Sequence, residues 1–441
     1  MKNLSLKFII TIALFTAFAS NTFSQTKEFT VDGIKVYYKQ IPKQIISVRL
    51  FISGGTNNYS LDQQGIESLA LSVAMNGGTT SKPKNVFNTE AEKIGTSFGS
   101  SSSLDYSEVN MTCIKPFWEK SWALFADAVM NPAFNAEDFD IIKSQAISGA
   151  KQREESPDAA LQEASMTNVF KGRSYEKVAN GTSGSLDKIT SDAAFAYYKN
   201  LIGKSRCFLV VVGNLTQEEV TAKIKATLSK LPAGTAAKMS PAVKITQGKE
   251  LVIERDIATN YVMGIMSSPS MLASDGVAMM VAMNVIDDYL FLEIRTKRGL
   301  SYAPNGGYNT NAITSPYSMI YASTDSPKKV IQVMVDLLNN AKENGISQEE
   351  IDNKKKEFLT TYLMGLETSA SQSSAIGRWA VRGDVKGFED FTNRVNAVTV
   401  KDVNRVIDQN TNAIIWTYLG KKSDVTDDDF KQTTIFKNKP Y

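Results

Sequence analysis

The stretch GIESLALSVAMNGGTT, from Gly65 to Thr80, predicts an amphipathic helix and raises the question of what that helix does. Its apolar residues recur at i, i+3, i+4, i+7 and i+8, the period of a helix with one buried face. The glycines at 77 and 78 predict the end of the helix. Ser68 and Ser72 stand one helical turn apart on a single face beside this stripe. The stripe itself consists of Ile66, Leu69, Ala70, Val73 and Ala74.

The composition excludes many kinds of site. With 441 residues and 42% hydrophobic residues, the chain is long enough for two to four globular domains. It contains no histidine. A Ser-His-Asp triad, a Cys-His pair and an imidazole metal ligand are therefore all ruled out within this chain.

The first 25 residues have the features of a secretory leader. Lys2 and Lys7 precede an apolar stretch that is too short to span a bilayer comfortably, and small residues follow it. Cleavage is expected after Ala19 or after Ser24. No apolar run of transmembrane length follows residue 25, so we expect an exported chain without a membrane span, with the periplasm as its compartment.

Loss of Lys2 and Lys7 lowers the formal net charge from +3 to +1. A nearly neutral chain without a basic stripe argues against nucleic acid as a partner.

The two cysteines, Cys113 and Cys207, stand in apolar, strand-like segments. A disulfide is allowed in an oxidising compartment, but two buried free thiols are the favoured interpretation.

The order of elements repeats along the chain. The first half ends with a helix over 191–202 and a buried strand over 207–214, and the second half ends with a helix over 398–409 and a strand over 413–421. Further strands are expected at 28–40, 45–55, 250–257, 260–269, 299–309 and 316–324, and further helices at 118–130, 135–156, 274–298, 328–345 and 345–367.

We therefore predict an α+β fold of two homologous domains, each a mostly antiparallel sheet packed with helices. The expected division is a leader over 1–25, a first domain over 26–230, a linker over 231–247, a second domain over 248–425 and a tail over 426–441. The linker is inferred from its lack of hydrophobic periodicity and its Pro, Gly, Ala and Lys content.

Two smaller sequence features are assigned no function. The stripe of Met279, Met280 and Met283 is expected to be core, and Lys354 to Lys356 a solvated helix face.

With these elements in this order, the chain resembles the insulinase and pitrilysin family of zinc peptidases, and within it two-domain subunits similar to mitochondrial processing peptidase. Active members carry H-x-x-E-H on the first helix, where two histidines bind zinc and the glutamate activates water. Here this motif falls on Ser68 to Ser72, with Leu71 at the position of the base. The third ligand position falls at Gly149 or within a residue of it. The resemblance thus implies a vacated zinc site and no metal or other cofactor bound by this chain.

Three glutamates near these positions are Glu67, Glu154 and Glu155. Each is expected to be a single carboxylate on a hydrated helix face rather than a substitute ligand.

One feature of the family is retained. Active assemblies use an arginine and a tyrosine from a C-terminal domain, in a segment similar to R-x-x-R-G-L-x-Y, to hold substrate opposite the zinc. The segment IRTKRGLSY places Arg295 and Tyr302 at the matching positions. Without the resemblance, Arg295 reads as a cation in the last turn of a helix with Gly299 at its C′ position, and Tyr302 as an ordinary strand aromatic.

The resemblance also implies that Gly95 to Val109 contains an edge strand that pairs with extended substrate. The polar GSSSS run within it is equally compatible with an open, hydrated edge and with a flexible loop.

The function implied is that of a non-catalytic subunit of an exported two-chain zinc peptidase. Such a subunit would form half of the chamber around an extended peptide, and would supply Arg295 and Tyr302 to a homologous zinc-bearing partner in a heterodimer. The alternative is a peptide-binding or assembly scaffold without peptidase work. A new catalytic site is a third possibility, for which the sequence offers no constellation of residues.

Overall fold

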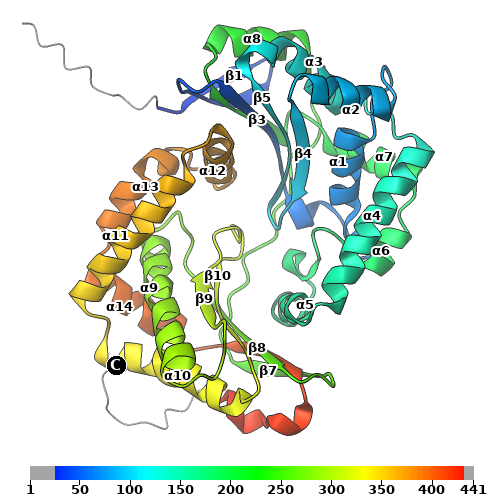
Figure 1. Ribbon diagram of the computed structural model, residues 1–441. Coiled ribbons are helices and arrows are strands. Elements are labelled where there is room, and N and C mark those ends of the chain that lie inside the picture. Colours follow the sequence, from blue (N-terminus) through cyan, green and yellow to red (C-terminus); the bar gives the residue numbers. More distant parts are fainter. Residues whose placement is uncertain (1–24, 432–441) are drawn as a thin grey trace, which may run out of the picture.

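The computed structural model describes residues 25–431. The leader predicted over residues 1–25 lies outside the described residues up to position 24, as does the last part of the predicted tail, 432–441. Two sheets with surrounding helices form the frame of the molecule (Figure 1).

The first sheet has the order β1-β2-β6-β3-β5-β4. β2 and β6 are parallel, and every other neighbouring pair is antiparallel. The strands are β1 (Lys27–Val31), β2 (Ile34–Gln40), β3 (Ile45–Ser53), β4 (Ser97–Ser102), β5 (Tyr106–Ile114) and β6 (Cys207–Gly213).

The second sheet has the order β7-β11-β8-β10-β9, again with one parallel pair, β7 and β11, and antiparallel neighbours elsewhere. Each strand of the second sheet has a counterpart at the same place in the first sheet, and β1 is an additional strand of the first sheet. The predicted duplication and α+β class are thereby confirmed. The strands are β7 (Lys249–Glu254), β8 (Asn260–Ser267), β9 (Asn305–Tyr308), β10 (Tyr317–Thr324) and β11 (Ile415–Gly420).

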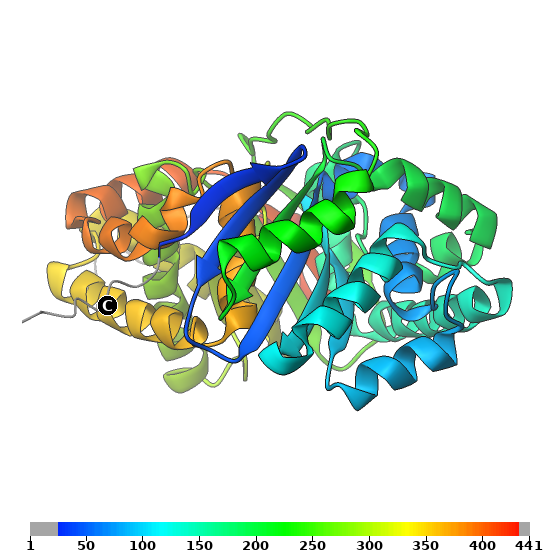
Figure 2. The same cartoon turned by 90° about the horizontal axis from the view of Figure 1, so that it is seen from above.

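The helices follow the same repeat, so that the long α4 corresponds to α11, and α7 before β6 corresponds to α14 before β11. In the first half they are α1 (Ile66–Asn76), α2 (Lys84–Lys93), α3 (Trp118–Met130), α4 (Ala136–Glu155), α5 (Pro157–Phe170), α6 (Ser183–Asp187), α7 (Ser191–Leu201) and α8 (Gln217–Ala226). In the second half they are α9 (Ser274–Leu290), which continues as a π-helix over Phe291–Thr296, α10 (Pro327–Asn344), α11 (Gln348–Gly365), α12 (Ser369–Val381), α13 (Lys386–Asn396) and α14 (Val400–Asn410). Seen from above, α8 lies against β1 (Figure 2).

The central strand β6 of the first sheet is buried on both faces. Leu209 and Val211 of β6 belong to the core beneath the helices of the first half. The alternate residues Phe208 and Val210 belong to the core that includes Ile376 of α12. Burial on both sides explains why the segment CFLVVVG is a continuous apolar run rather than an alternating one.

Each half covers part of the other's sheet. From the second half, α12 packs on β3 and β6. Arg49 Nε donates to Ser373 Oγ at 2.9 Å in this contact. From the first half, α5 packs on β8 and β11, where Asn168 Nδ2 donates to the carbonyl oxygen of Trp416 at 3.2 Å. This exchange of helices fixes how the halves sit together.

The loops that precede β5 and β10 also join the halves. Asp105, between β4 and β5, accepts hydrogen bonds from the backbone N–H groups of Ile313 at 2.7 Å and Thr314 at 3.3 Å, before β10. Tyr175 OH donates to the same carboxylate. Asp105 is fully buried in this contact.

Three details differ from the sequence-based predictions. The strand predicted over 28–40 is a hairpin, because Asp32 and Gly33 both have positive φ, at 46° and 88°, and turn the chain back. Of the strand predicted over 299–309, only Asn305–Tyr308 pairs in the sheet. Lys354 and Lys355 are buried rather than solvated.

The first of these lysines pairs with Asp288 at 2.6 Å, and the second donates to the carbonyl oxygen of Val398 at 2.9 Å. The core also reaches past residue 425, since Phe430 is 5% exposed and stands beside the ring of Trp416.

Other predictions hold. Met279, Met280 and Met283 are buried core residues. Cys113 and Cys207 are free and buried, as favoured. Burial raises the pKa of the Cys113 thiol to about 11 and that of the Cys207 thiol to about 12. Both thiols are therefore protonated and unreactive at neutral pH.

The residues predicted as a linker, 231–247, contain no helix or strand. Both halves nonetheless hold this segment. Ser240 N–H donates to Asn57 Oδ1 of the first half at 2.9 Å, and Val243 N–H donates to Ser315 Oγ of the second at 3.0 Å. Among residues 25–431, no helix is long and apolar enough to cross a membrane.

Candidate functional site

The first helix is folded and packed as its sequence predicts. The apolar stripe of α1 is buried, and Leu71, at the position of the family's catalytic base, is fully buried in the same core. Ser68 and Ser72 are partly exposed on the neighbouring face. Ser68 Oγ donates to Asn180 Oδ1 at 3.0 Å, so this hydroxyl belongs to a loop contact.

Gly149 lies on α4, which packs against α1. A Cβ placed on Gly149 would meet nothing within 4 Å, so the space for a longer side chain is present. The donor set of Ser68, Ser72 and Gly149 does not fit zinc, because it holds no imidazole, thiolate or carboxylate. Within residues 25–431, no group of three His, Cys, Asp or Glu side chains is arranged to hold a metal ion.

Glu67 departs from the sequence-based expectation of a hydrated carboxylate. Its side chain is fully buried. It accepts hydrogen bonds from Ser107 Oγ at 2.5 Å, Tyr197 OH at 2.6 Å and Asn58 Nδ2 at 2.9 Å. Burial raises the pKa of its carboxyl, against the opposing effect of these donors. Glu67 thus ties α1 to β5 and α7, and no sequence pattern indicated this role.

Glu154 caps the start of α6 rather than tying α1 to its neighbours. It accepts hydrogen bonds from the backbone N–H of Ser183 at 2.6 Å and from Ser183 Oγ at 2.7 Å, at the start of α6. These bonds hold the pKa of its carboxyl below the usual value. The remaining glutamate, Glu155, is exposed at the end of α4, as expected.

The segment with the serine run is a strand, not a flexible loop. β4 lies at the edge of the first sheet, where it pairs with β5 in the register Ser100 to Val109. α1 packs beside it. An edge strand presents unpaired backbone N–H and C=O groups on its outer side, which is the requirement for pairing with another extended chain.

Arg295 and Tyr302 are brought together at the end of α9. The guanidinium carbon of Arg295 lies 4.2 Å from the centroid of the Tyr302 ring and 4.9 Å from that of Phe291. The Tyr302 side chain is 78% exposed and belongs to no strand, so the interpretation of it as a strand aromatic is wrong. The expected helix end is confirmed, because Gly299 has φ of 61° and its N–H donates to the Arg295 carbonyl oxygen at 3.1 Å.

The Arg295–Tyr302 pair and the positions predicted to correspond to a zinc site lie in different halves. α1 belongs to the first half and α9 to the second, and Figure 1 shows these two helices on opposite sides of the molecule. Arg295 lies in the π-helix over Phe291–Thr296, a rare conformation that is frequent at functional sites, and Tyr302 follows after this helix has ended.

Two pockets lie near the parts of the chain described above. One, of about 310 Å³, lies between the halves, with Asn180 and Tyr175 from the first and Asn309 and Tyr317 from the second among its lining residues. It adjoins α1 through Asn180, whose side chain accepts a hydrogen bond from Ser68.

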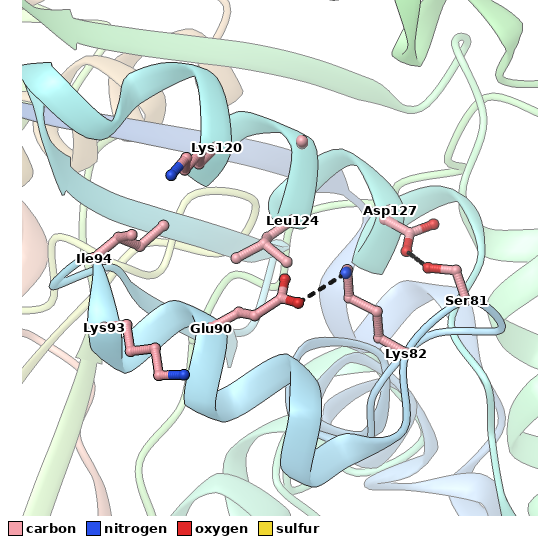
Figure 3. A pocket seen from close by; sticks show the side chains of 9 residues that line it. Ser81, Lys82, Glu90, Lys93, Ile94, Lys120, Leu124 and Asp127 are labelled. Carbon is pink, nitrogen blue, oxygen red and sulfur yellow. Dashed lines mark hydrogen bonds and ion pairs between the residues drawn. The ribbon is translucent and has the colours of Figure 1, made fainter.

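The other, of about 560 Å³, lies between α2 and α3 and has an apolar floor that includes Ile94 and Leu124 (Figure 3). Lys82 pairs there with Glu90 at 3.0 Å. No site residue predicted from the sequence lines this pocket.

Two family models match the chain. The model described as insulinase (peptidase family M16) matches residues 35–183, and the model described as peptidase M16 inactive domain matches residues 188–358. The first match ends at the first residue of α6 and the second begins just after this helix, so β6, which belongs to the first sheet, falls within the second match.

Known relatives and structures agree with this assignment. An uncharacterized zinc protease of Rickettsia bellii is 24% identical over 383 residues, covering 84% of this chain and 92% of its own. The non-peptidase homolog YmxG of Helicobacter pylori is 21% identical over 418 residues, covering 92% and 96%. The crystal structure of a peptidase M16 inactive domain from Pseudomonas fluorescens has the same fold, with a TM-score of 0.83, 19% identity, and coverage of 90% of this chain and 98% of that one. The two models together span most of the chain, which therefore belongs to the insulinase (M16) peptidase family and contains an M16 domain of the inactive type.

Proposed function

We propose that this chain is the non-catalytic subunit of an exported, two-chain M16 metallopeptidase. It forms half of the chamber around an extended peptide and supplies Arg295 and Tyr302 to the zinc site of a homologous partner. The observation that carries the proposal is the stacking of the partly exposed Arg295 on the exposed Tyr302, in a chain whose own predicted zinc positions hold Ser68, Ser72 and Gly149.

The chemistry of the pair suits this task. A guanidinium and a phenol are donors that grip a peptide carbonyl, and they bind the oxyanion formed from it more strongly as negative charge develops. Stacking on Tyr302 and Phe291 orients the Arg295 guanidinium before substrate arrives, so less conformational entropy is lost on binding. Zinc is expected in the partner, where it would activate the attacking water.

Substrate would be held by backbone pairing. The outer side of β4 is an edge onto which an extended peptide can add as a further strand. The serine side chains of β4 keep this edge polar, so its exposure costs little free energy. The leader predicted over residues 1–25 directs the assembly to an exported compartment, and we assign it to the periplasm.

Reconstitution tests the proposal. The mature chain would be co-expressed with an exported M16 chain from the same genome that has an intact H-x-x-E-H motif. Zinc content and cleavage of a library of unstructured peptides would be measured for each chain alone and for the mixture. We expect this chain alone to hold no stoichiometric zinc and to cleave nothing, and the mixture to cleave. A complex that forms but is no more active than the partner alone would overturn the proposal.

Affinity purification separates the proposal from the scaffold alternative. The tagged chain should recover a zinc-motif homologue in an equimolar complex. Recovery of stable complexes that never contain such a homologue would favour a binding or assembly scaffold, in which Arg295 and Tyr302 have no catalytic task.

A further inference from the structure

Three cations lie within four residues beside the proposed substrate contact, and they differ in their side-chain partners. Arg295 lies in the π-helix that continues α9, and Lys297 and Arg298 come directly after this helix. Lys297 and Arg298 form ion pairs with Glu293, one on each carboxylate oxygen. Among residues 25–431, Arg295 has no carboxylate partner and contacts two aromatic rings instead.

Glu293 is placed to hold both neighbours. Its side chain is 2% exposed, although Phe291 and Leu292 just before it are 48% and 41% exposed. Lys297 Nζ donates to Oε1 at 2.5 Å. Arg298 Nη1 donates to Oε2 and also to the Glu293 backbone carbonyl oxygen at 2.9 Å.

The ion pairs keep this carboxyl charged. Burial acts to raise its pKa, but the hydrogen bonds from Lys297 and Arg298 outweigh burial and bring the pKa below its usual value. A buried carboxylate with two cations is a stronger tether than an exposed i,i+4 pair, which contributes little.

The geometry points to Glu293 as a specificity-determining positioning residue, an inference that rests on the proposed function of the pair. By binding Lys297 and Arg298, Glu293 leaves Arg295 as the cation of this segment that is free to meet a peptide. A single stacked guanidinium recognises a backbone carbonyl, which every peptide has. Three free cations would select acidic side chains instead. The proposed substrate class is therefore peptides without an acidic residue at the position that Arg295 contacts.

Replacement of the carboxylate tests the inference. Glu293→Gln keeps the size of the side chain but releases Lys297 and Arg298 from their ion pairs. The probes are two fluorescent extended peptides that differ by Gln or Glu at the residue after the cleaved bond. In the reconstituted assembly, Glu293→Gln should raise the kcat/KM ratio of the acidic to the neutral peptide by about five- to tenfold at low salt. This gain should fall in 0.5 M salt, because exposed charges are screened there over roughly 4 Å.

A second variant distinguishes an effect of the released cations from an effect of losing the buried carboxylate on the local structure. The variant Glu293→Gln, Lys297→Gln, Arg298→Gln carries the same core change but has no released cations, so its peptide ratio should return to that of the unmodified chain. A ratio that stays unchanged in Glu293→Gln, or that stays high in the triple variant, would overturn the inference.

A second assay does not depend on a partner. Anisotropy titrations of the same two peptides against this chain alone should show the same gain for the acidic peptide in Glu293→Gln and the same reversal in the triple variant. A failed reconstitution would thus count against the proposed function, while the titrations still decide the role of Glu293. Equal ratios for all three forms in the titrations would overturn that role.

Discussion

Gly377 of α12 lies directly against the ring of Phe51 on β3, so close that a Cβ at position 377 would come within 2.0 Å of ring carbons. This contact joins the second half to the first sheet, and it explains why a residue without a side chain occupies the middle of α12.

Gly377→Ala should therefore destabilise the protein. Although alanine favours helix, the added methyl forces the ring or the helix to move, at a cost of about 1–3 kcal/mol. Urea unfolding of the mature chain would measure this loss. The control is Gly365→Ala at the end of α11, where a Cβ meets nothing within 4 Å. That variant should be neutral or more stable by up to about 1 kcal/mol, and equal effects at the two sites would contradict the packing argument.

The buried carboxyl of Glu67 should make stability depend on pH. Its pKa is raised in the folded protein, so the folded state binds the proton more tightly than the unfolded state does. The stability that this group contributes is complete below its unfolded pKa, and it is lost as pH rises toward and through the raised folded pKa.

Glu67→Gln mimics the protonated form and can keep all three hydrogen bonds if Ser107 accepts instead of donating. The free energy of unfolding of Glu67→Gln relative to the unmodified chain should therefore increase between pH 4 and pH 8, measured by urea titration. A difference that is flat over this range would contradict the prediction. Glu67→Ala should cost about 1–3 kcal/mol at all these pH values, because it leaves buried donors unpaired.

If α1 corresponds to the zinc helix of active relatives, it should bind zinc once ligands are placed at the predicted positions. Ser68→His, Ser72→His and Gly149→Glu together rebuild the ligand set on α1 and α4, and the open space at Gly149 accommodates the longer side chain. This variant should hold about one zinc ion per chain after dialysis, measured by atomic emission. Leu71 is left in place because it is fully buried. The control is the double histidine variant without the glutamate, which should retain less zinc. A folded triple variant that retains none would show that the backbone positions have moved apart.

Arg295→Ala should lower kcat of the reconstituted assembly by about 10²- to 10³-fold, the effect of losing a donor to the oxyanion. Tyr302→Phe should lower it less, because the ring remains to stack on the guanidinium. Arg173→Ala, at an exposed arginine of the first half, serves as the control and should leave the rate unchanged. Full activity of Arg295→Ala would remove the pair from the proposed site.

The thiols of Cys113 and Cys207 should be inert in the folded chain. Because burial raises their pKa values to about 11 and about 12, almost no thiolate is present at pH 8. A thiol-specific chromogenic reagent should therefore titrate no groups in native buffer and two per chain in 6 M guanidinium chloride. Rapid reaction of either cysteine without denaturant would contradict the prediction.

Local sequence patterns were sufficient for much of the fold. The stripe of α1, the apolar run of β6 and the repeated order of elements all reflect short-range periodicity, which burial of one or both faces imposes on the sequence. The hairpin at Asp32 and Gly33 has a local Asp-Gly signal, but the apolar residues on both sides of it also fit one continuous strand.

Other features had no local signal. Glu67 and Lys354 are ordinary charged helix residues in the sequence, and both are buried in the structure because distant elements supply their partners. The serine run at β4 was compatible with a loop or an edge strand, and only its pairing with β5 decided between them.

The sequence by itself determined which zinc ligands this chain lacks. It contains no histidine, and the positions that the resemblance assigns to ligands and base are Ser68, Leu71, Ser72 and Gly149, a matter of residue identity that no folding can change. The tertiary structure alone decided how the remaining groups are arranged. It buried Glu293 against two of three neighbouring cations and placed the Arg295 guanidinium over the rings of Phe291 and Tyr302. Desolvation, ion pairing and ring contacts depend on where side chains meet in space, and linear spacing does not specify them.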